Sequence, residues 1–201
     1  YLEELTTCRD IWVPSETVTN RTREFTGRSE CALIKTSVRP WENDKKSSTK
    51  YAVDVMRKYP DPNRDHAHDH CKAIGIDLIE TKNDRPWEEF KQIIANAQFL
   101  ISAQFEASTG GLTLVEGYWH GVPSLISNSP RHGGHEYFGC RAEYFQWDNP
   151  ILFRRKLMEM MDSPPKVDID EAREWITKEY SEYAMAYRMA KRFWELYDES
   201  N

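Results

Sequence analysis

The segment Ser108–Pro123 combines residue types that can bind a phosphate and sugar hydroxyl groups. Gly110 and Gly111 leave a bare backbone just before a stretch that is expected to be helical. An anion can therefore approach the unpaired N–H groups of the first helical turn, at the positive end of the helix dipole. Glu116 follows about one and a half turns into this helix, where its carboxylate can accept hydrogen bonds from hydroxyls. A sugar nucleotide carries both kinds of group.

Two short apolar runs flank this segment and predict the strands that position it. Ala97–Ala103 and Val122–Ser127 are each bounded by polar residues, as buried strands of a parallel sheet are. The helix between them is then a crossover, and the glycines fall at the carboxyl end of the first strand, where open parallel sheets bind ligands. On the glycines alone, a tight turn without a ligand is the competing interpretation.

The order of these residues resembles the C-terminal, donor-binding domain of GT-B glycosyltransferases, in the retaining group that uses nucleotide-diphosphate sugars. In that family a strand, a glycine-containing turn, a helix with a glutamate, a G-x-P and a second strand follow one another, as in Gly111–Ile126. The likeness continues through Ser127–Gly139 and covers Ile74–Tyr197. It implies an α/β fold, with a Rossmann-like parallel sheet and flanking helices, that forms the donor-binding half of a GT-B architecture.

The resemblance also implies an activity. A hexosyl group would pass from a nucleotide-diphosphate sugar to a carbohydrate, lipid-linked or protein acceptor with retention, and no cofactor or metal would take part. The family usually has a second glutamate eight residues before the helical one, and this chain has Ser108 there. Two alternatives stay open: a catalytically inactive nucleotide-sugar-binding or regulatory subunit, which Ser108 favours, and a GT-B-like sugar-nucleotide epimerase.

Donor-binding residues follow from the same resemblance. The two cations that clamp the diphosphate match Arg39 and either Lys45 or Lys46, although solvated surface charges are the alternative for this hydrophilic stretch. For Ile79, the alternative to contact with a nucleobase is a position in the hydrophobic core. The resemblance assigns the diphosphate to Arg39, Lys45, Lys46, Gly110, Gly111, Leu112 and Thr113, the sugar and ribose to Ser108, Thr109 and Glu116, and the nucleobase to Ile79, Glu80 and Thr81.

Length and charge limit the remaining possibilities. The chain has 201 residues and a formal net charge of −6. Such a length can bury roughly 70% of the unfolded surface, and it favours one domain or one domain plus fragments of another. The acidic balance gives no reason to expect a nucleic-acid partner. No apolar run approaches the roughly 18 residues that span a bilayer, and the N-terminus lacks a signal peptide, so we expect a cytoplasmic protein, free or at the cytoplasmic face of a membrane.

The resemblance divides the chain into three parts. Residues 1–30 would end an acceptor-side domain or form a linker, residues 31–169 would form the nucleotide-sugar-binding domain, and residues 170–201 would form a C-terminal helix that crosses back. A GT-B enzyme has two Rossmann-like domains facing a cleft. We therefore expect a partner domain or subunit, or a longer protein of which this is a part.

Histidines and cysteines could also bind metal. His66, His68 and His70 alternate with aspartates in Asp61–Cys71, and imidazole and carboxylate both ligate zinc or nickel. Alternating histidines in a segment rich in Pro, Asn and Asp more often form a solvated loop, which is our prediction. The four cysteines lack zinc-site spacing and are expected to be reduced structural thiols.

His132 and His135 lie in the loop after the second predicted strand. They are expected near the donor cleft as loop caps or supporting groups and not as a general base. The remaining patterns predict further elements. Helices are expected at Tyr1–Cys8, Glu16–Thr26, Ser48–Lys58, Trp87–Asn96, Asn149–Met161 and Glu171–Tyr197, and strands at Asp10–Pro14, Cys31–Thr36 (the first donor-domain strand by resemblance), Ile74–Glu80 and Ala142–Phe145.

Overall fold

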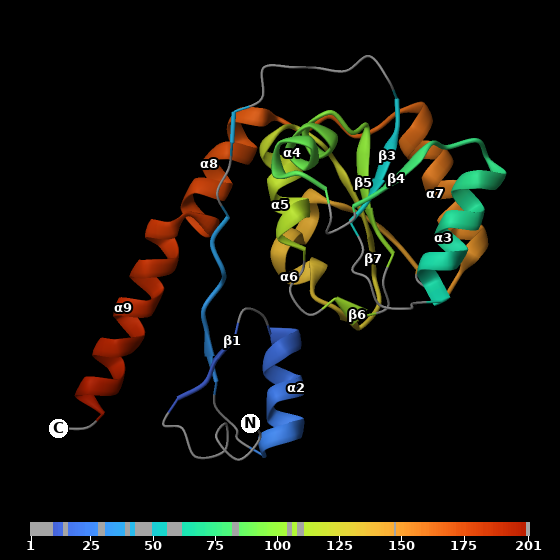
Figure 1. The fold of residues 1–201 in the computed structure, drawn as a ribbon. Coiled ribbons are helices and arrows are strands. Elements are labelled where there is room, and N and C mark those ends of the chain that lie inside the picture. Colours follow the sequence, from blue (N-terminus) through green and yellow to red (C-terminus); the bar gives the residue numbers. More distant parts are fainter. Residues whose placement is uncertain are drawn as a thin grey trace.

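A five-stranded parallel sheet forms the centre of the protein (Figure 1). The computed structural model describes residues 10–13, 16–27, 31–38, 41–42, 50–55, 62–81, 85–103, 106–107, 111–146 and 148–199. The strands lie in the order β4-β3-β5-β7-β9. They are β3 (Ala52–Asp54), β4 (Leu78–Glu80), β5 (Phe99–Ser102), β7 (Ser124–Ser127) and β9 (Glu143–Phe145). Because β4 lies on one side of β3 and β5 on the other, the strand order reverses between β3 and β5.

Helices cover both faces of this sheet, which explains why its central strand is apolar almost throughout. Leu100 of β5 packs toward one face, and its neighbours Phe99 and Ile101 pack toward the other. The Leu100 face is covered by α4 (Trp87–Ala95), α5 (Leu112–Trp119), α6 (Gly134–Phe138) and α8 (Ile169–Tyr180), and the opposite face by α3 (Pro62–Ala73) and α7 (Pro150–Asp162). The predicted Rossmann-like α/β fold with flanking helices is therefore confirmed.

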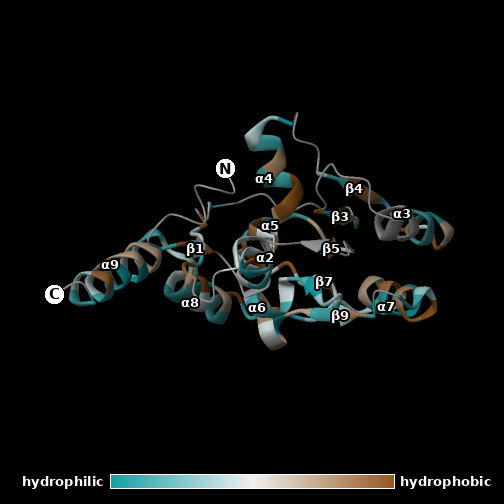
Figure 2. Cartoon of the chain, turned by 90° about the horizontal axis from the view of Figure 1, so that it is seen from below, coloured by the Kyte–Doolittle hydropathy of each residue, from teal (hydrophilic) through white to brown (hydrophobic). Residues whose placement is uncertain are grey.

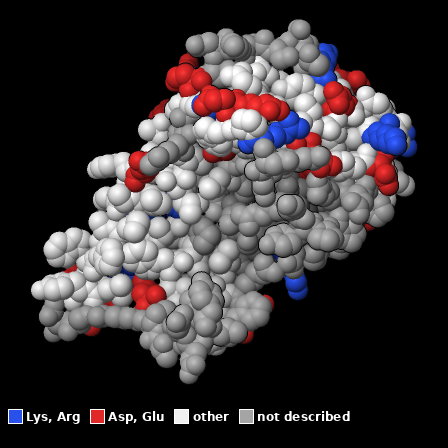
Figure 3. Space-filling model, in the orientation of Figure 1, with Lys and Arg blue, Asp and Glu red and all other residues white. Residues whose placement is uncertain are grey.

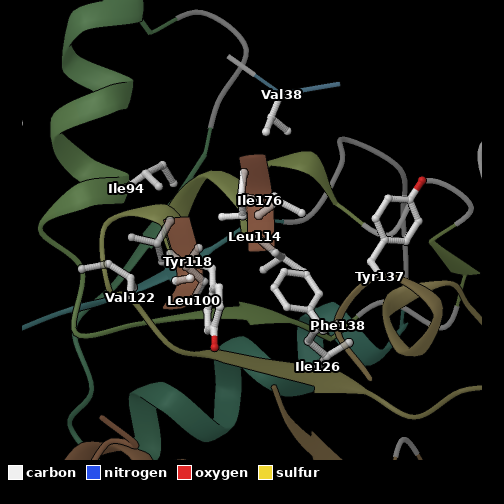
Figure 4. Packing of buried hydrophobic residues seen from close by; sticks show 14 of the residues in the cluster. Val38, Ile94, Leu100, Leu114, Tyr118, Val122, Ile126, Tyr137, Phe138 and Ile176 are labelled. Atoms are coloured by element: carbon white, nitrogen blue, oxygen red, sulfur yellow. The ribbon is translucent and has the colours of Figure 1, made fainter. Parts of the chain in front are cut away.

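Helix α5 approaches the sheet unusually closely. A Cβ atom added to Gly117 would lie 2.4 Å from Leu100 Cδ1, so only glycine allows this contact. Leu114 and Tyr118 on the same helix pack into the core that Figure 4 shows, together with Phe138. Figure 2 shows the hydrophobic residues of α5 and of the adjoining part of α4 beside the sheet. This packing determines where α5 begins relative to the strands of the sheet.

The N-terminal segment forms a second, smaller unit with the last helix. Strand β1 (Trp12–Val13) leads into α2 (Glu16–Thr26), and it pairs in parallel with β2 (Ala32–Leu33). Helix α9 (Glu182–Asp198) lies along this pair (Figure 1). Arg192 Nε donates to Asp10 Oδ2 at 2.9 Å, and the rings of Trp12 and Phe193 are 5.0 Å apart. Cys31–Thr36, predicted as the first strand of the donor domain, contains β2, which pairs with β1 and not with a strand of the central sheet.

Helix α9 differs from the other long helices in its burial. None of its residues is buried, and Tyr183, Tyr187 and Trp194 are more than half exposed. Trp175 and Tyr180 of α8, in contrast, pack against the core. The aromatic residues of Glu171–Tyr197 thus differ between the two helices: those of α8 pack against the core, and those of α9 are largely exposed.

Three other predicted elements are wrong. Ser48–Lys58 contains strand β3 instead of a helix, because three buried residues of that segment pair with both neighbouring strands. Asp61–Cys71 lies largely in α3 instead of a loop, because Ala67 and Cys71, four residues apart, pack against the core. The single helix Glu171–Tyr197 is interrupted at Ser181, whose extended backbone and Oγ atom begin α9.

Several other expectations hold closely. Helix α2 has the predicted bounds, and Gly27 ends it with a φ of 68°. The strands and helices predicted between Trp87 and Met161 appear with small shifts at their ends. The helix expected at Tyr1–Cys8 lies outside the described residues, and the predicted domain boundaries remain predictions.

Surface properties of the described residues add two observations. No helix among them is both long and apolar enough to cross a bilayer. Carboxylates and cations are interspersed over the larger lobe in Figure 3.

Cys31, Cys71 and Cys140, the described cysteines, are free thiols, and burial raises the pKa of the Cys71 thiol to about 12.

Replacing Gly117 with alanine tests the close packing of α5. The added Cβ would collide with Leu100, so we expect Gly117→Ala to lower the free energy of unfolding by about 1 to 3 kcal/mol, despite the higher helix propensity of alanine. Urea denaturation followed by circular dichroism measures this. Ala190→Ser, on the exposed side of α9, is the control and should stay within about 0.5 kcal/mol of the parent. An unchanged Gly117→Ala midpoint would mean that α5 can move away from β5 at little cost.

Candidate functional site

The carboxyl ends of β3, β5 and β7 lie along one edge of the sheet. Strand β6 (Glu106–Ala107) comes directly after β5, and β8 (Arg131–His132) comes after β7. These two short strands pair in parallel, so the loops after two neighbouring sheet strands are joined at this edge (Figure 1). The edge also lies where the strand order reverses, which is where open α/β sheets bind ligands.

Helix α5 begins at this edge with a glycine that no other residue could replace without strain. Gly111 is the N-cap, with a φ of 74°, and a Cβ there would lie 3.1 Å from Leu114 Cδ1. Its carbonyl accepts a hydrogen bond from Leu114 N at 2.8 Å, and no side chain caps the helix. The N–H groups of Leu112 and Thr113 have no acceptor among the described residues. Gly111 thus lies at a helix N-terminus, as expected, whereas Gly110 lies outside the described residues.

Glu116 lies on α5, one turn beyond these donors. Its carboxyl is largely buried, and burial raises its pKa from 4.5 to about 7. No hydrogen bond or ion pair to a described residue offsets this cost. A carboxyl in this state is divided between its two protonation forms near neutral pH, and a ligand hydroxyl that donates to it would stabilise the ionised form.

The predicted nucleobase residues reach the same edge at the end of β4. Thr81 donates to the Asp54 carbonyl from both its N–H and its hydroxyl, each at 3.0 Å, which joins the ends of β4 and β3. Ile79 is partly buried and packs against the core, in line with its alternative interpretation. Ile79, Glu80 and Thr81 therefore lie at the expected edge, and their contact with a base remains a prediction.

A histidine between two carboxylates is a feature that the sequence analysis missed. Asp54, at the end of β3, is only 1% exposed, and its Oδ2 lies 2.8 Å from His68 Nε2 on α3. His68 Nδ1 lies 3.5 Å from Glu80 Oε1 on β4. The cluster therefore joins three elements beside the predicted nucleobase strand. Its residues are distant in sequence, and the segments of Asp54 and His68 were assigned to the wrong kind of element.

A second buried contact at this edge was also missed. Ser102 Oγ, at the end of β5, lies 2.8 Å from His132 Nε2, and Gly134 N donates to His132 Nδ1 at 3.0 Å. His135 is exposed, and its ring stacks on Tyr144 with centroids 4.0 Å apart. His132 therefore caps its loop as expected, whereas His135 lies on the surface.

The structure describes only some of the remaining predicted positions. Arg39, Lys45, Lys46, Ser108, Thr109 and Gly110 lie outside the described residues. Within the described part, no group of three or more His, Cys, Asp or Glu side chains is placed to hold a metal ion. Cavities of about 440 and 270 Å³ are lined by residues of α9 and β2 and by residues around Tyr118 and Arg141, respectively. Neither is lined by a predicted donor residue.

The raised pKa of Glu116 predicts how stability depends on pH. As pH rises from 4.5 to about 7, the unfolded chain loses this proton before the native protein does, so the native state loses stability. Glu116→Gln removes the effect and should raise the free energy of unfolding at pH 8 by about 1 to 3 kcal/mol, with a smaller gain at pH 5. Urea titrations at both pH values test this, with the exposed Glu174→Gln as control. An equal gain at both pH values would contradict it.

Comparison with known proteins gives matches at the level of structure alone. No protein-family model matches the chain, and no curated protein matches it significantly. The lipopolysaccharide outer core galactosyltransferase WaaB gives a TM-score of 0.64 at 14% identity, over 92% of this chain and 61% of its own. Sucrose-phosphate synthase from Thermosynechococcus elongatus gives 0.69 at 11% identity, over 98% and 61%. HepE from Anabaena, solved with UDP and glucose, gives 0.69 at 11% identity, over 97% and 68%.

These matches include nearly all of this chain, which spans about three fifths to two thirds of the matched proteins. At such low identity the likeness concerns the fold. The resemblance seen in the sequence is confirmed at that level: the chain has an α/β fold, with a five-stranded parallel sheet and flanking helices, that resembles one Rossmann-like half of the GT-B architecture.

Proposed function

We propose that this chain is the donor-binding half of a retaining GT-B glycosyltransferase that transfers a hexosyl group from a nucleotide-diphosphate sugar. One observation supports this above the others. Helix α5 places the N–H groups of its first turn, which have no partner within the helix, and the buried carboxyl of Glu116 together at the carboxyl edge of the sheet. The N–H groups can bind a diphosphate, and the carboxyl can accept a hydrogen bond from a sugar or ribose hydroxyl. The match to HepE, which was solved with UDP and glucose, is consistent with this chemistry.

In this proposal the protein works by positioning and charge stabilisation. Negative charge grows on the leaving diphosphate in the transition state, and the N–H groups of Leu112 and Thr113 meet it at the positive end of α5. Arg39 and one of Lys45 or Lys46 supply the remaining positive charge. Glu116 accepts hydrogen bonds from donor hydroxyls and so fixes the sugar relative to the phosphates. No general base is required from this half.

The acceptor side completes the proposal. β1, α2, β2 and α9 form a unit separate from the central sheet, and the matched structures are longer than this chain. A partner domain or subunit, or a further part of the same protein, would then hold the carbohydrate, lipid-linked or protein acceptor. A nucleotide-sugar-binding subunit without turnover is the second candidate, because Ser108 stands where the family usually has a glutamate.

Ligand screening and product analysis separate these candidates. A thermal-shift panel of UDP-, GDP-, ADP- and dTDP-sugars identifies the donor, since ligand at 100 times its dissociation constant adds roughly 2.7 kcal/mol of stability. Acceptor-dependent release of nucleoside diphosphate would then establish the transferase. Binding without turnover would indicate a regulatory subunit, and interconversion of the donor sugar an epimerase. No shift with any donor would contradict the proposal.

Glu116→Gln should weaken the binding of the donor found in this panel about 5- to 150-fold, because hydrogen bonds to charged groups contribute about 1 to 3 kcal/mol. Isothermal titration calorimetry at pH 8 measures this. Glu174→Gln again serves as the control. Glu116→Gln is expected to be more stable than the parent at this pH, so its weaker binding could not be attributed to unfolding. Equal affinity in variant and parent would remove Glu116 from the site.

Arg39→Ala tests the diphosphate clamp. A guanidinium that contacts phosphate stabilises a nucleoside diphosphate but not the corresponding nucleoside, so only the diphosphate should lose affinity, by about tenfold or more. Calorimetry with both ligands separates the two cases. Arg155→Ala, on the exposed surface of α7, is the matched control. Parallel losses for the two ligands, or no loss, would show that Arg39 does not touch the diphosphate.

A further inference from the structure

The contact between Ser102 and His132 is buried and connects two segments of the chain. Ser102 is 4% exposed at the end of β5, and His132 is 3% exposed in β8. The distance from Ser102 Oγ to His132 Nε2 is 2.8 Å, and Gly134 N lies 3.0 Å from His132 Nδ1. Both ring nitrogens of the histidine therefore have a partner.

These partners determine which nitrogen of His132 carries the proton. The N–H of Gly134 can only donate, so Nδ1 must present its lone pair. A neutral imidazole then holds its hydrogen on Nε2 and donates it to Ser102 Oγ. Burial lowers the pKa of His132 to about 4, which keeps the ring neutral. In this state His132 cannot accept the serine proton, so the pair is not a nucleophile and its base.

The same bond holds both loops at the carboxyl edge. His132 lies in β8, opposite Ala107 of β6, and Ala107 precedes Gly111, the N-cap of α5, by four residues in the sequence. The bond to Ser102 joins this pair of strands to the end of the central strand β5. Gly134 fits the loop tightly onto β7, since a Cβ there would lie 2.5 Å from Ile126 Cγ2. His132 thus links β5 to β8 and, through strand pairing, to β6, the strand that precedes α5 in the chain.

We propose that His132 is a positioning residue for the donor site: its neutral ring, protonated on Nε2, ties β8 and β6 to Ser102 and so holds Gly111, at the start of α5, in its binding position. The part that concerns the donor rests on the proposed function. The tie between the loops and β5 does not, and it can be measured without any ligand.

Three variants separate the two bonds of His132. In His132→Asn the amide oxygen can still accept from Gly134 N, but the side chain is too short to reach Ser102. In His132→Gln the longer side chain can still donate to Ser102. Ser102→Ala removes the acceptor and leaves the histidine in place. The exposed His135→Asn is the matched control, and all variants are made in the full chain.

Nitrogen-15 NMR at pH 7 should find Nδ1 of His132 unprotonated and Nε2 protonated. Amide exchange at residues 106–107 and 131–134 should be about five- to tenfold faster in His132→Asn and Ser102→Ala, and near the parental rate in His132→Gln and His135→Asn. Amide exchange in the double variant of His132→Asn and Ser102→Ala should be no faster than in either single variant. Affinity for the donor found in the panel should fall about five- to tenfold in the same two variants.

Two results would overturn the proposal: a proton on Nδ1 of His132, or parental amide exchange in Ser102→Ala. Faster exchange with parental donor affinity would also contradict it, since the tie would then have no effect on the site. If the parent binds no nucleotide sugar, the proposed function fails, and the exchange rates still decide whether His132 holds the loops.

Discussion

The contact between Gly117 of α5 and Leu100 of β5 is the constraint on which the carboxyl edge of this protein depends. Because Leu100 is fully buried and packs directly against Gly117, a shift of α5 along the sheet would disturb this packing, and the position of the first turn of α5 depends on it. Gly111 then has to reverse the chain in a left-handed conformation, and Glu116 is placed where burial raises its pKa. The positions of Gly111 and Glu116 therefore depend on the close packing of Gly117, on the same helix, against the sheet.

Five of the seven buried polar residues in the described part of the chain lie at this same edge, and Thr19 and Ser124 lie elsewhere. Asp54, Ser102, Ser127, Ser129 and His132 are all buried at or just beyond the ends of β3, β5 and β7. Buried polar groups destabilise a protein unless hydrogen bonds replace the lost water, and neighbouring loops supply such bonds here. An arrangement of this kind is common where a binding site lies in an otherwise apolar fold.

Sequence patterns predicted those parts of the fold whose apolar residues are numerous and close together. The runs around β5 and β7 and the amphipathic α4 are of this kind. Strand β3 was missed because it has only three residues, all buried, next to a polar stretch, and its identity depends on pairing with both neighbours. Helix α3 was missed because its buried face consists of small residues such as Ala67 and Cys71.

For the site, local spacing was sufficient to place Gly111 and Glu116, because both belong to one turn and one helix. The contacts of Asp54 with His68 and of Ser102 with His132 join residues 14 and 30 positions apart. No local pattern reveals such pairs, since the strand order brings them together. The tautomer of His132 likewise depends on Gly134 and Ser102 at once.

The manner in which α9 is attached has a consequence for its response to ionic strength. This helix buries no side chain, and its described links to the rest of the chain include the ion pairs of Arg192 with Asp10 and of Arg188 with Glu179, each at 2.9 Å. Salt screens charges near the surface far more than it weakens the apolar core of the sheet. Helix α9 should therefore detach as a separate cooperative unit before the sheet unfolds, and at high salt its detachment should need less free energy.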